Sequence, residues 1–189
     1  MQLILASKSP RRAQLLNQVG VKFKIIPSHI DESIHLSANP VQAVRQLALA
    51  KAQSVADKRN TGIIIGADTI VVINRKILGK PKNQADARRL LTQLSGKTHQ
   101  VITGIAVIDA KTKTKKVSHC ITSVRFCKLT KKAIDEYIAT GDPFDKAGGY
   151  GIQGKGALFV ACITGDYFNV VGLPLVSLFR LLDSFLLKK

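Results

Sequence analysis

The chain has 189 residues, of which 46% are hydrophobic and 22% charged, so it is long enough to bury a core and too apolar to be disordered. Its formal net charge of +17 and isoelectric point near 10.1 predict an anionic partner such as a nucleic acid, a phosphorylated small molecule or a membrane surface. The basic residues are spread along the chain and aromatic residues make up only 5%, which disfavours a dedicated nucleic-acid-binding module.

Strand-like and helix-like segments alternate along the sequence, which predicts an α/β fold with a mixed sheet. Asn39 and Pro40 are typical of a helix start, and Gly96 and Gly141 follow predicted helix ends. The lysine-rich segment 111–116 separates two strand-like segments and is most simply a solvated hairpin tip. In chain order the predicted elements are strand 2–6, helix 10–18, strand 22–27, helix 40–58, strand 63–73, strand 77–78, helix 84–94, strand 100–109, strand 117–128, helix 131–140, a glycine-rich loop, strands near 157–163 and 166–171, and an amphipathic helix from 173 to 187.

The cysteines and histidines indicate which cellular compartment and which kinds of metal site are compatible with the sequence. The three cysteines form neither a C-x-x-C pair nor an even disulfide framework, which is typical of reduced thiols. The four histidines show no metal-ligand spacing, which disfavours a zinc site. No basic leader precedes segment 2–6 and no apolar stretch approaches the length of a membrane span. We therefore expect a cytoplasmic protein without membrane association.

Asp68 is the most informative residue, because it interrupts the β-branched, apolar run 62–73. Such a run is typical of a buried strand, where a carboxylate is costly unless it is hydrogen-bonded, paired or bound to a cation. The alternative to a functional role is a structural aspartate satisfied by nearby backbone N–H groups.

The segment 7–12 (SKSPRR) follows the first predicted strand and opens the first helix. Ser9 as N-cap and Pro10 in the first turn make an ordinary helix start. Arg11 and Arg12, however, oppose the helix macrodipole, whereas an anion there would meet backbone N–H groups and two guanidinium groups. The pattern favours a phosphate site, although it is neither a P-loop nor a dinucleotide-binding motif.

Other polar residues extend this interpretation, each with a simpler alternative. Glu32, beside Asp31, is either a solvated turn or a second carboxylate that, with Asp68, suits Mg²⁺ or Mn²⁺. Lys51 and Lys80 are either snorkelling surface lysines or phosphate ligands. The segment 145–156 has glycines that let backbone amides approach a ligand, and its Gln153 suits a base edge; the alternative is a mobile surface loop.

Together these residues resemble the Maf family of nucleoside triphosphate pyrophosphatases nearly from end to end. The segments that carry the resemblance are LASKSPRR (5–12), GADT (66–69), GKP (79–81), LSGKTH (94–99), DKAGGYGIQG (145–154) and VGLP (171–174). The resemblance implies one domain over residues 1–189, with two lobes around a central cleft and a strongly twisted mixed sheet flanked by helices, related to the inosine triphosphate pyrophosphatases. Gly149, where the family usually has alanine, departs from the pattern and should be tolerated.

The resemblance also implies roles for individual residues. Asp68 matches the proposed catalytic carboxylate, and Arg12, Thr69 and Gln153 match the positions that mark the branch acting on dTTP and UTP. The remaining matches to polar cleft positions are Ser7, Arg11, Glu32, Lys51, Lys80 and Lys146. A homodimer is expected from the family likeness alone.

The mechanism we expect is metal-assisted attack of water on the α-phosphorus. An exposed aspartate is too weak a base to deprotonate bulk water, whereas a cation held by Asp68 and Glu32 would acidify a water and bridge phosphate oxygens. Lys80 and the other cations would counter the triphosphate charge. Two alternatives stay open: the same chemistry on a modified purine nucleotide, and a basic nucleic-acid-binding protein without catalysis.

Overall fold

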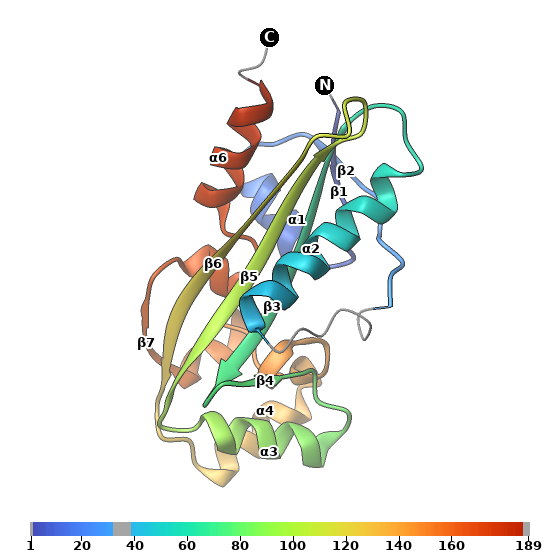
Figure 1. Ribbon diagram of the computed structural model, residues 1–189. Coiled ribbons are helices and arrows are strands. Elements are labelled where there is room, and N and C mark those ends of the chain that lie inside the picture. The colour runs from blue at the N-terminus through green and yellow to red at the C-terminus, as the bar shows by residue number, and fades with distance from the viewer. Residues whose placement is uncertain (1, 32–38, 187–189) are drawn as a thin grey trace. The chain divides into compact units, whose positions relative to one another are not determined.

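A mixed seven-stranded sheet forms the centre of the fold. The computed structural model describes residues 2–31 and 39–186. Its strands are β1 (Leu3–Leu5), β2 (Phe23–Ile25), β3 (Ile63–Ile73), β4 (Lys76–Leu78), β5 (Thr98–Asp109), β6 (Lys115–Phe126) and β7 (Val160–Thr164). They are ordered β2-β1-β3-β5-β6-β7, with β4 paired to β3 (Figure 1). Because β1 is parallel to β2 and β3 while the β3–β4 and β6–β7 pairs are antiparallel, the predicted α/β class with a mixed sheet is confirmed.

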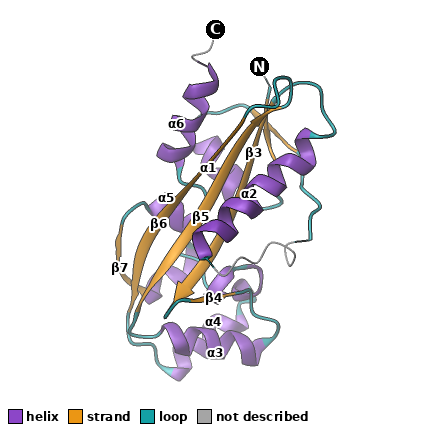
Figure 2. Cartoon of the chain, in the orientation of Figure 1, coloured by secondary structure: helices purple, strands orange, loops and turns teal. Residues whose placement is uncertain are grey.

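Six α-helices accompany the strands in the described residues (Figure 2). They are α1 (Pro10–Gln18), α2 (Pro40–Ala56), α3 (Gln84–Leu94), α4 (Lys131–Ala139), α5 (Tyr167–Val171) and α6 (Leu175–Leu186). The predicted cap at Asn39 is confirmed, since its side chain accepts hydrogen bonds from the backbone N–H groups of Val41 at 2.9 Å and Gln42 at 3.3 Å. None of the helices in this part of the chain is both long and apolar enough to traverse a bilayer.

The strand predicted near 166–171 is wrong, because most of this segment forms the short helix α5. Asp166 explains the difference: its Oδ1 accepts hydrogen bonds from the N–H groups of Phe168 at 2.7 Å and Asn169 at 3.3 Å, which starts a helical turn. Asn169, fully buried, then donates to the carbonyl of Val101 and to the Thr122 hydroxyl. The neighbouring strand prediction was also too early, since residues 154–159 form a 3-10 helix before β7.

Both predicted hairpins are confirmed. Asn74 and Arg75 join β3 to β4 with φ angles of 49° and 63°, as a two-residue hairpin turn of type I′ requires of its central residues. At the lysine-rich tip between β5 and β6, the Asp109 side chain accepts a hydrogen bond from the N–H of Lys111 at 2.8 Å. The tip is thus an ordered turn rather than a loose loop.

The chain divides into two compact units. Unit 1 contains the residues up to Asp68, residues 103–120 and the residues from Gly172 onward; unit 2 contains residues 69–102 and 121–171. The core of unit 1 packs small side chains of α2 against β1, β3 and β5. Its fully buried members include Ile4, Ala48, Ala52, Ile64, Ala106 and Ile108.

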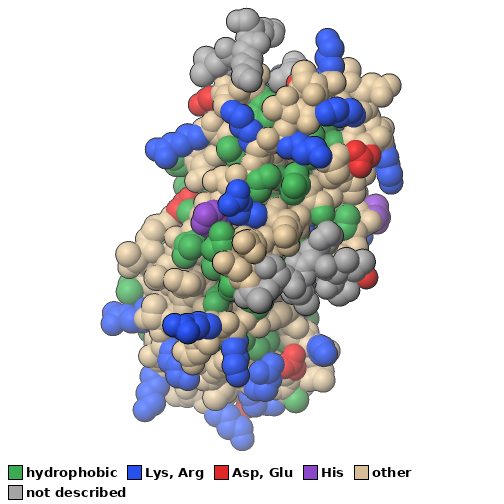
Figure 3. All heavy atoms as spheres, in the orientation of Figure 1, with side chains coloured by type: hydrophobic (Ala, Val, Ile, Leu, Met, Phe, Trp, Pro, Cys, Tyr) green, Lys and Arg blue, Asp and Glu red, His purple; other side chains and the backbone are tan. Residues whose placement is uncertain are grey.

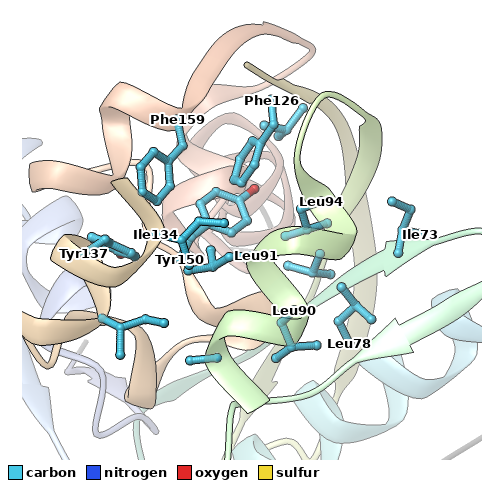
Figure 4. Close-up of a cluster of buried hydrophobic side chains, with 14 of the residues drawn as sticks. Ile73, Leu78, Leu90, Leu91, Leu94, Phe126, Ile134, Tyr137, Tyr150 and Phe159 are labelled. Carbon is cyan, nitrogen blue, oxygen red and sulfur yellow. The ribbon is translucent and has the colours of Figure 1, made fainter. Parts of the chain in front are cut away.

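The core of unit 2 is more aromatic. Phe126, Tyr137, Tyr150 and Phe159 form a chain of edge-to-face contacts, with ring centroids 4.6 to 6.1 Å apart (Figure 4). Leucines from one face of α3 pack beside these rings, as the spacing of Leu90, Leu91 and Leu94 predicts. This core supports the glycine-rich segment that follows α4.

Candidate functional site

Asp68 lies in the middle of β3 and is 7% exposed, as the sequence predicts. Its Oδ1 is 2.6 Å from the Nζ of Lys51, which comes from α2 and is 8% exposed. A buried carboxylate needs such a partner, because desolvating an unpaired charge costs several kcal/mol. The pair accounts both for the acid in an apolar strand and for the lysine on the apolar side of α2.

Two glycines bring α2 close enough to make this pair. A Cβ on Gly66 would lie 2.2 Å from the carbonyl oxygen of Ala48 and 2.7 Å from the nitrogen of Ala52. One on Gly104 would lie 2.2 Å from the carbonyl oxygen of Val44. Both contacts are impossible for any other residue without moving the helix. Gly66 is therefore needed for the ion pair of Asp68, because it lets the helix that carries Lys51 pack closely against β3.

Ser7 and Arg12 also meet in unit 1. The Arg12 side chain is 8% exposed and donates from Nη1 to the Ser7 hydroxyl at 3.1 Å and from Nε to the carbonyl oxygen of Gly172 at 2.8 Å. Ser7 also accepts from the N–H of Ser9 at 3.2 Å, while the Ser9 side chain makes no capping bond. The Ser7 hydroxyl and the Arg12 guanidinium thus lie together at the start of α1, and Arg11 beside them is half-buried.

In unit 2, Lys146 is held by acidic neighbours. Its Nζ lies 2.8 Å from Asp142 Oδ1, 2.7 Å from Asp145 Oδ1 and 2.6 Å from the carbonyl oxygen of Asp142. Asp142 in turn accepts from the Tyr137 hydroxyl at 2.9 Å, and that hydroxyl accepts from the N–H of Gly151 at 3.2 Å. This network ties the glycine-rich segment to α4.

The loop containing Lys80 is joined to the same segment, since the N–H of Gly148 donates to the carbonyl oxygen of Gly79 at 3.0 Å. Lys80 and Gln153 are exposed, and Thr69, next to Asp68 on β3, is half-buried. Gly149 has a φ of 73°, and a Cβ there would meet only ordinary contacts at 3.6 Å or more. The space therefore tolerates either glycine or the alanine usual in the resembled family, and only the backbone angle favours glycine.

His99 belongs to a motif for which the sequence suggested no role, and the structure supplies one. It is 2% exposed, its Nε2 lies 2.7 Å from the Tyr150 hydroxyl, and its ring packs edge-on against Phe126. Burial lowers the pKa of His99 to about 4, so the ring is neutral at physiological pH. Because Tyr150 precedes Gly151, the histidine anchors the glycine-rich segment from inside the core.

The predicted site residues therefore fall into separate groups. Unit 1 brings Ser7 to Arg12 and Lys51 to Asp68, whereas unit 2 holds Lys146 in a local acidic network. Glu32 lies outside the described residues. A cavity of about 470 Å³ in unit 2, lined by residues that include Lys128, Tyr137, Lys155 and Phe159, contains none of the predicted site residues.

The donor set indicates which metal could bind. Within residues 2–31 and 39–186, no cluster of three or more His, Cys, Asp or Glu side chains could hold an ion. Mg²⁺ and Mn²⁺ do not require such a cluster, because they bind one or two protein carboxylates and take their other ligands from substrate and water.

Comparison with known proteins gives a consistent match over nearly the whole chain. A family model described as "Maf-like protein" matches residues 2–185. A protein from Moorella thermoacetica named "dTTP/UTP pyrophosphatase" is 53% identical over 184 residues, covering 97% of this chain and 95% of its own length. A protein of the same name from a Geobacillus species is 54% identical over 174 residues, covering 92% of each. A solved HAM1 protein from Coxiella burnetii aligns with a TM-score of 0.49 and 16% identity over 69% of this chain and 75% of its own.

Proposed function

The chain belongs to the Maf-like protein family, and we propose that it is a nucleoside triphosphate pyrophosphatase that hydrolyses dTTP and UTP to the monophosphate and pyrophosphate. Relatives more than half identical to it over almost their full length carry the name dTTP/UTP pyrophosphatase. The structural observation that carries the proposal is the buried pair of Asp68 and Lys51, 2.6 Å apart on adjacent elements. A catalytic carboxylate must be held in one orientation, and this pair does so.

Asp68 is proposed to orient the attacking water and accept its proton. Lys51 fixes the carboxylate through Oδ1 and supplies positive charge beside the reacting phosphate. A divalent cation held by Asp68, with Glu32 as the proposed second ligand, would acidify water and draw charge from phosphate oxygens. Without the lysine, the carboxylate would have to be desolvated unpaired, so the pair also explains how an aspartate is tolerated in an apolar strand.

Several charged and polar groups are proposed to bind the triphosphate. The Ser7 hydroxyl and the Arg12 guanidinium lie together at the start of α1, whose N-terminal amides also favour an anion. Arg11, Lys80 and Lys146 are proposed to contact other phosphate oxygens. Lys146 is already paired with Asp142 and Asp145, so its contact with substrate requires exchange of one of these partners.

Thr69 and Gln153 are proposed to recognise the pyrimidine base. Both side chains offer hydrogen-bond donors and acceptors, and a base with the wrong edge would leave them unpaired. His99 and Tyr137 support this recognition by anchoring the segment that carries Gln153. The same chemistry on a modified purine nucleotide would require a different base contact at these positions.

One assay tests the function directly. Pyrophosphate release is measured with dTTP, UTP, the purine triphosphates and modified nucleotides, each with and without Mg²⁺ or Mn²⁺. The proposal predicts metal-dependent release with dTTP and UTP and little with the purines. Preference for a modified purine would overturn the substrate assignment, and no release with any nucleotide would overturn the enzymatic proposal. A homodimer and a cytoplasmic location stay predictions.

A further inference from the structure

The positive charge of unit 1 gathers at one end of its strands. The N–H of Ile63 donates to the carbonyl oxygen of Gln2 and that of Ala110 to the carbonyl oxygen of Gly62, both at 2.9 Å, and Leu3 pairs with Phe23. The starts of β1, β2 and β3 and the tip joining β5 to β6 therefore share this end. We call it the basic end because of the cations on these segments: Lys22, Lys58, Arg59, Lys111, Lys113, Lys115 and Lys116.

Few acidic groups offset these cations on the same segments. Asp57 and Asp109 are the neighbouring carboxylates, and both take part in local structure. Asp109 Oδ1 accepts from the backbone N–H of Lys111, and Asp57 Oδ1 accepts from the amide of Gln53 at 2.5 Å. Five of the seven cations are exposed, while Arg59 and Lys116 are half-buried. Figure 3 shows, on the face it draws, that basic side chains outnumber acidic ones.

The proposed catalytic function does not account for the basic end. Asp68 lies five residues along β3 from Ile63, which corresponds to about 17 Å at about 3.3 Å per residue. A lysine side chain at the far end of the strand is too short to contact a phosphate group that reacts at Asp68. Gathering like charges costs stability through mutual repulsion, so a second anionic partner would give the arrangement a use.

Backbone hydrogen bonds hold the hairpin tip at this end in one conformation. The N–H of Lys113 donates to the carbonyl oxygen of Asp109 at 2.8 Å, and the N–H of Asp109 donates to that of Thr114 at 3.0 Å. The hydroxyls of Thr112 and Thr114 are 3.0 Å apart. Lysines therefore alternate with threonines on a fixed turn, and ordering it on binding costs little entropy.

We propose that the basic end binds the phosphate backbone of nucleic acid without sequence preference. Ammonium, hydroxyl and backbone N–H groups are the usual phosphate donors, and a two-stranded β-ribbon fits the major groove of duplex DNA. An anionic membrane is the other polyanionic surface, but interfacial binding also uses an exposed apolar face. Among the described residues of unit 1, the exposed large hydrophobic side chains are those of Val19, Ile25 and Val176, which lie outside the tip.

Fluorescence anisotropy with a labelled DNA duplex of about 20 base pairs tests the proposal. If about four phosphates are neutralised, the full chain should lose about 10²-fold in affinity between roughly 50 and 200 mM salt. A Lys111→Gln/Lys113→Gln/Lys115→Gln variant should bind far more weakly and reduce the slope of log affinity against log salt by about 2 to 3. The matched control, Lys97→Gln/Lys128→Gln/Lys131→Gln, removes three exposed lysines of unit 2.

The control should bind DNA within about twofold of the parent chain, and both variants should keep the parent rate of pyrophosphate release, because neither alters the candidate site. Three results would overturn the proposal. One is no DNA binding by the parent chain at low salt. The second is an equal loss in both variants, which would mean that only overall charge matters. The third is that the parent chain binds vesicles rich in anionic lipid but not DNA, and that the tip variant no longer binds the vesicles.

Discussion

Replacing Gly66 by alanine tests how the fold builds the candidate site. The new Cβ would lie 2.2 Å from the carbonyl oxygen of Ala48, whereas ordinary contacts begin near 3.4 Å, so α2 must move by about 1.2 Å. Overpacking that side chains can relieve costs about 1 to 3 kcal/mol. Here the obstacle is backbone of a 17-residue helix packed against the core of unit 1. We expect a loss of at least about 3 kcal/mol in the free energy of unfolding.

Urea unfolding followed by circular dichroism measures this loss. At the slopes usual for small proteins, about 3 kcal/mol lowers the unfolding midpoint by roughly 1 to 3 M. Gly79→Ala is the control, because a Cβ there meets nothing within 4 Å and its φ is not positive, so its stability should stay within about 0.5 kcal/mol of the parent. If Gly66→Ala were as stable as Gly79→Ala, close approach of α2 would not be the reason for this glycine.

Other perturbations test the charges and anchors of the two units. Lys51→Met should destabilise the fold by about 3 to 5 kcal/mol, because it strands the Asp68 carboxylate, and adding Asp68→Asn should restore much of that loss in urea unfolding; an unrestored double variant would contradict the pairing. His99 binds a proton near pH 6.5 in the unfolded chain but only near pH 4 in the folded chain. Its contribution to the free energy of unfolding is therefore full above about pH 6.5 and is lost as the pH falls from there to about 4. We expect about 2 kcal/mol of stability to be lost between about pH 7 and pH 5 through this residue, and less in a His99→Gln variant; equal pH dependence of the two proteins would refute the assignment. Tyr137→Phe should cost about 1 kcal/mol and raise KM for dTTP more than it lowers kcat, and an unchanged KM would mean that the Gly151 contact does not position the loop.

Much of the fold follows from local patterns in the sequence. The bounds of α1, β3 and α3 agree with the prediction, because the signals are local: a proline in the first turn of α1, a β-branched run in β3, and an N-cap and a regular apolar face in α3. The helix α5 was missed because Asp166 redirects a β-branched, aromatic segment through its own backbone hydrogen bonds. An aspartate before such a segment is a signal that could have been used.

The candidate site was harder to foresee where it depends on distant contacts. The burial of Asp68 follows from its strand, but its pairing with Lys51 depends on where α2 crosses the sheet, which Gly66 and Gly104 determine. The carbonyl that Arg12 contacts lies 160 residues along the chain. The acidic partners of Lys146 were visible, since Asp142 precedes it by four residues at a spacing typical of helical ion pairs.

The turnover of dTTP by an Asp68→Asn variant tests the central claim most directly. The amide keeps the size of the side chain and can still contact Lys51, so the fold and nucleotide binding should survive while the proton acceptor is lost. We predict that pyrophosphate release with metal present falls by about 10² to 10⁴-fold, with the affinity for a non-hydrolysable dTTP analogue changed only a few fold. Release at a rate near that of the parent chain would contradict the assignment of Asp68 as the catalytic carboxylate.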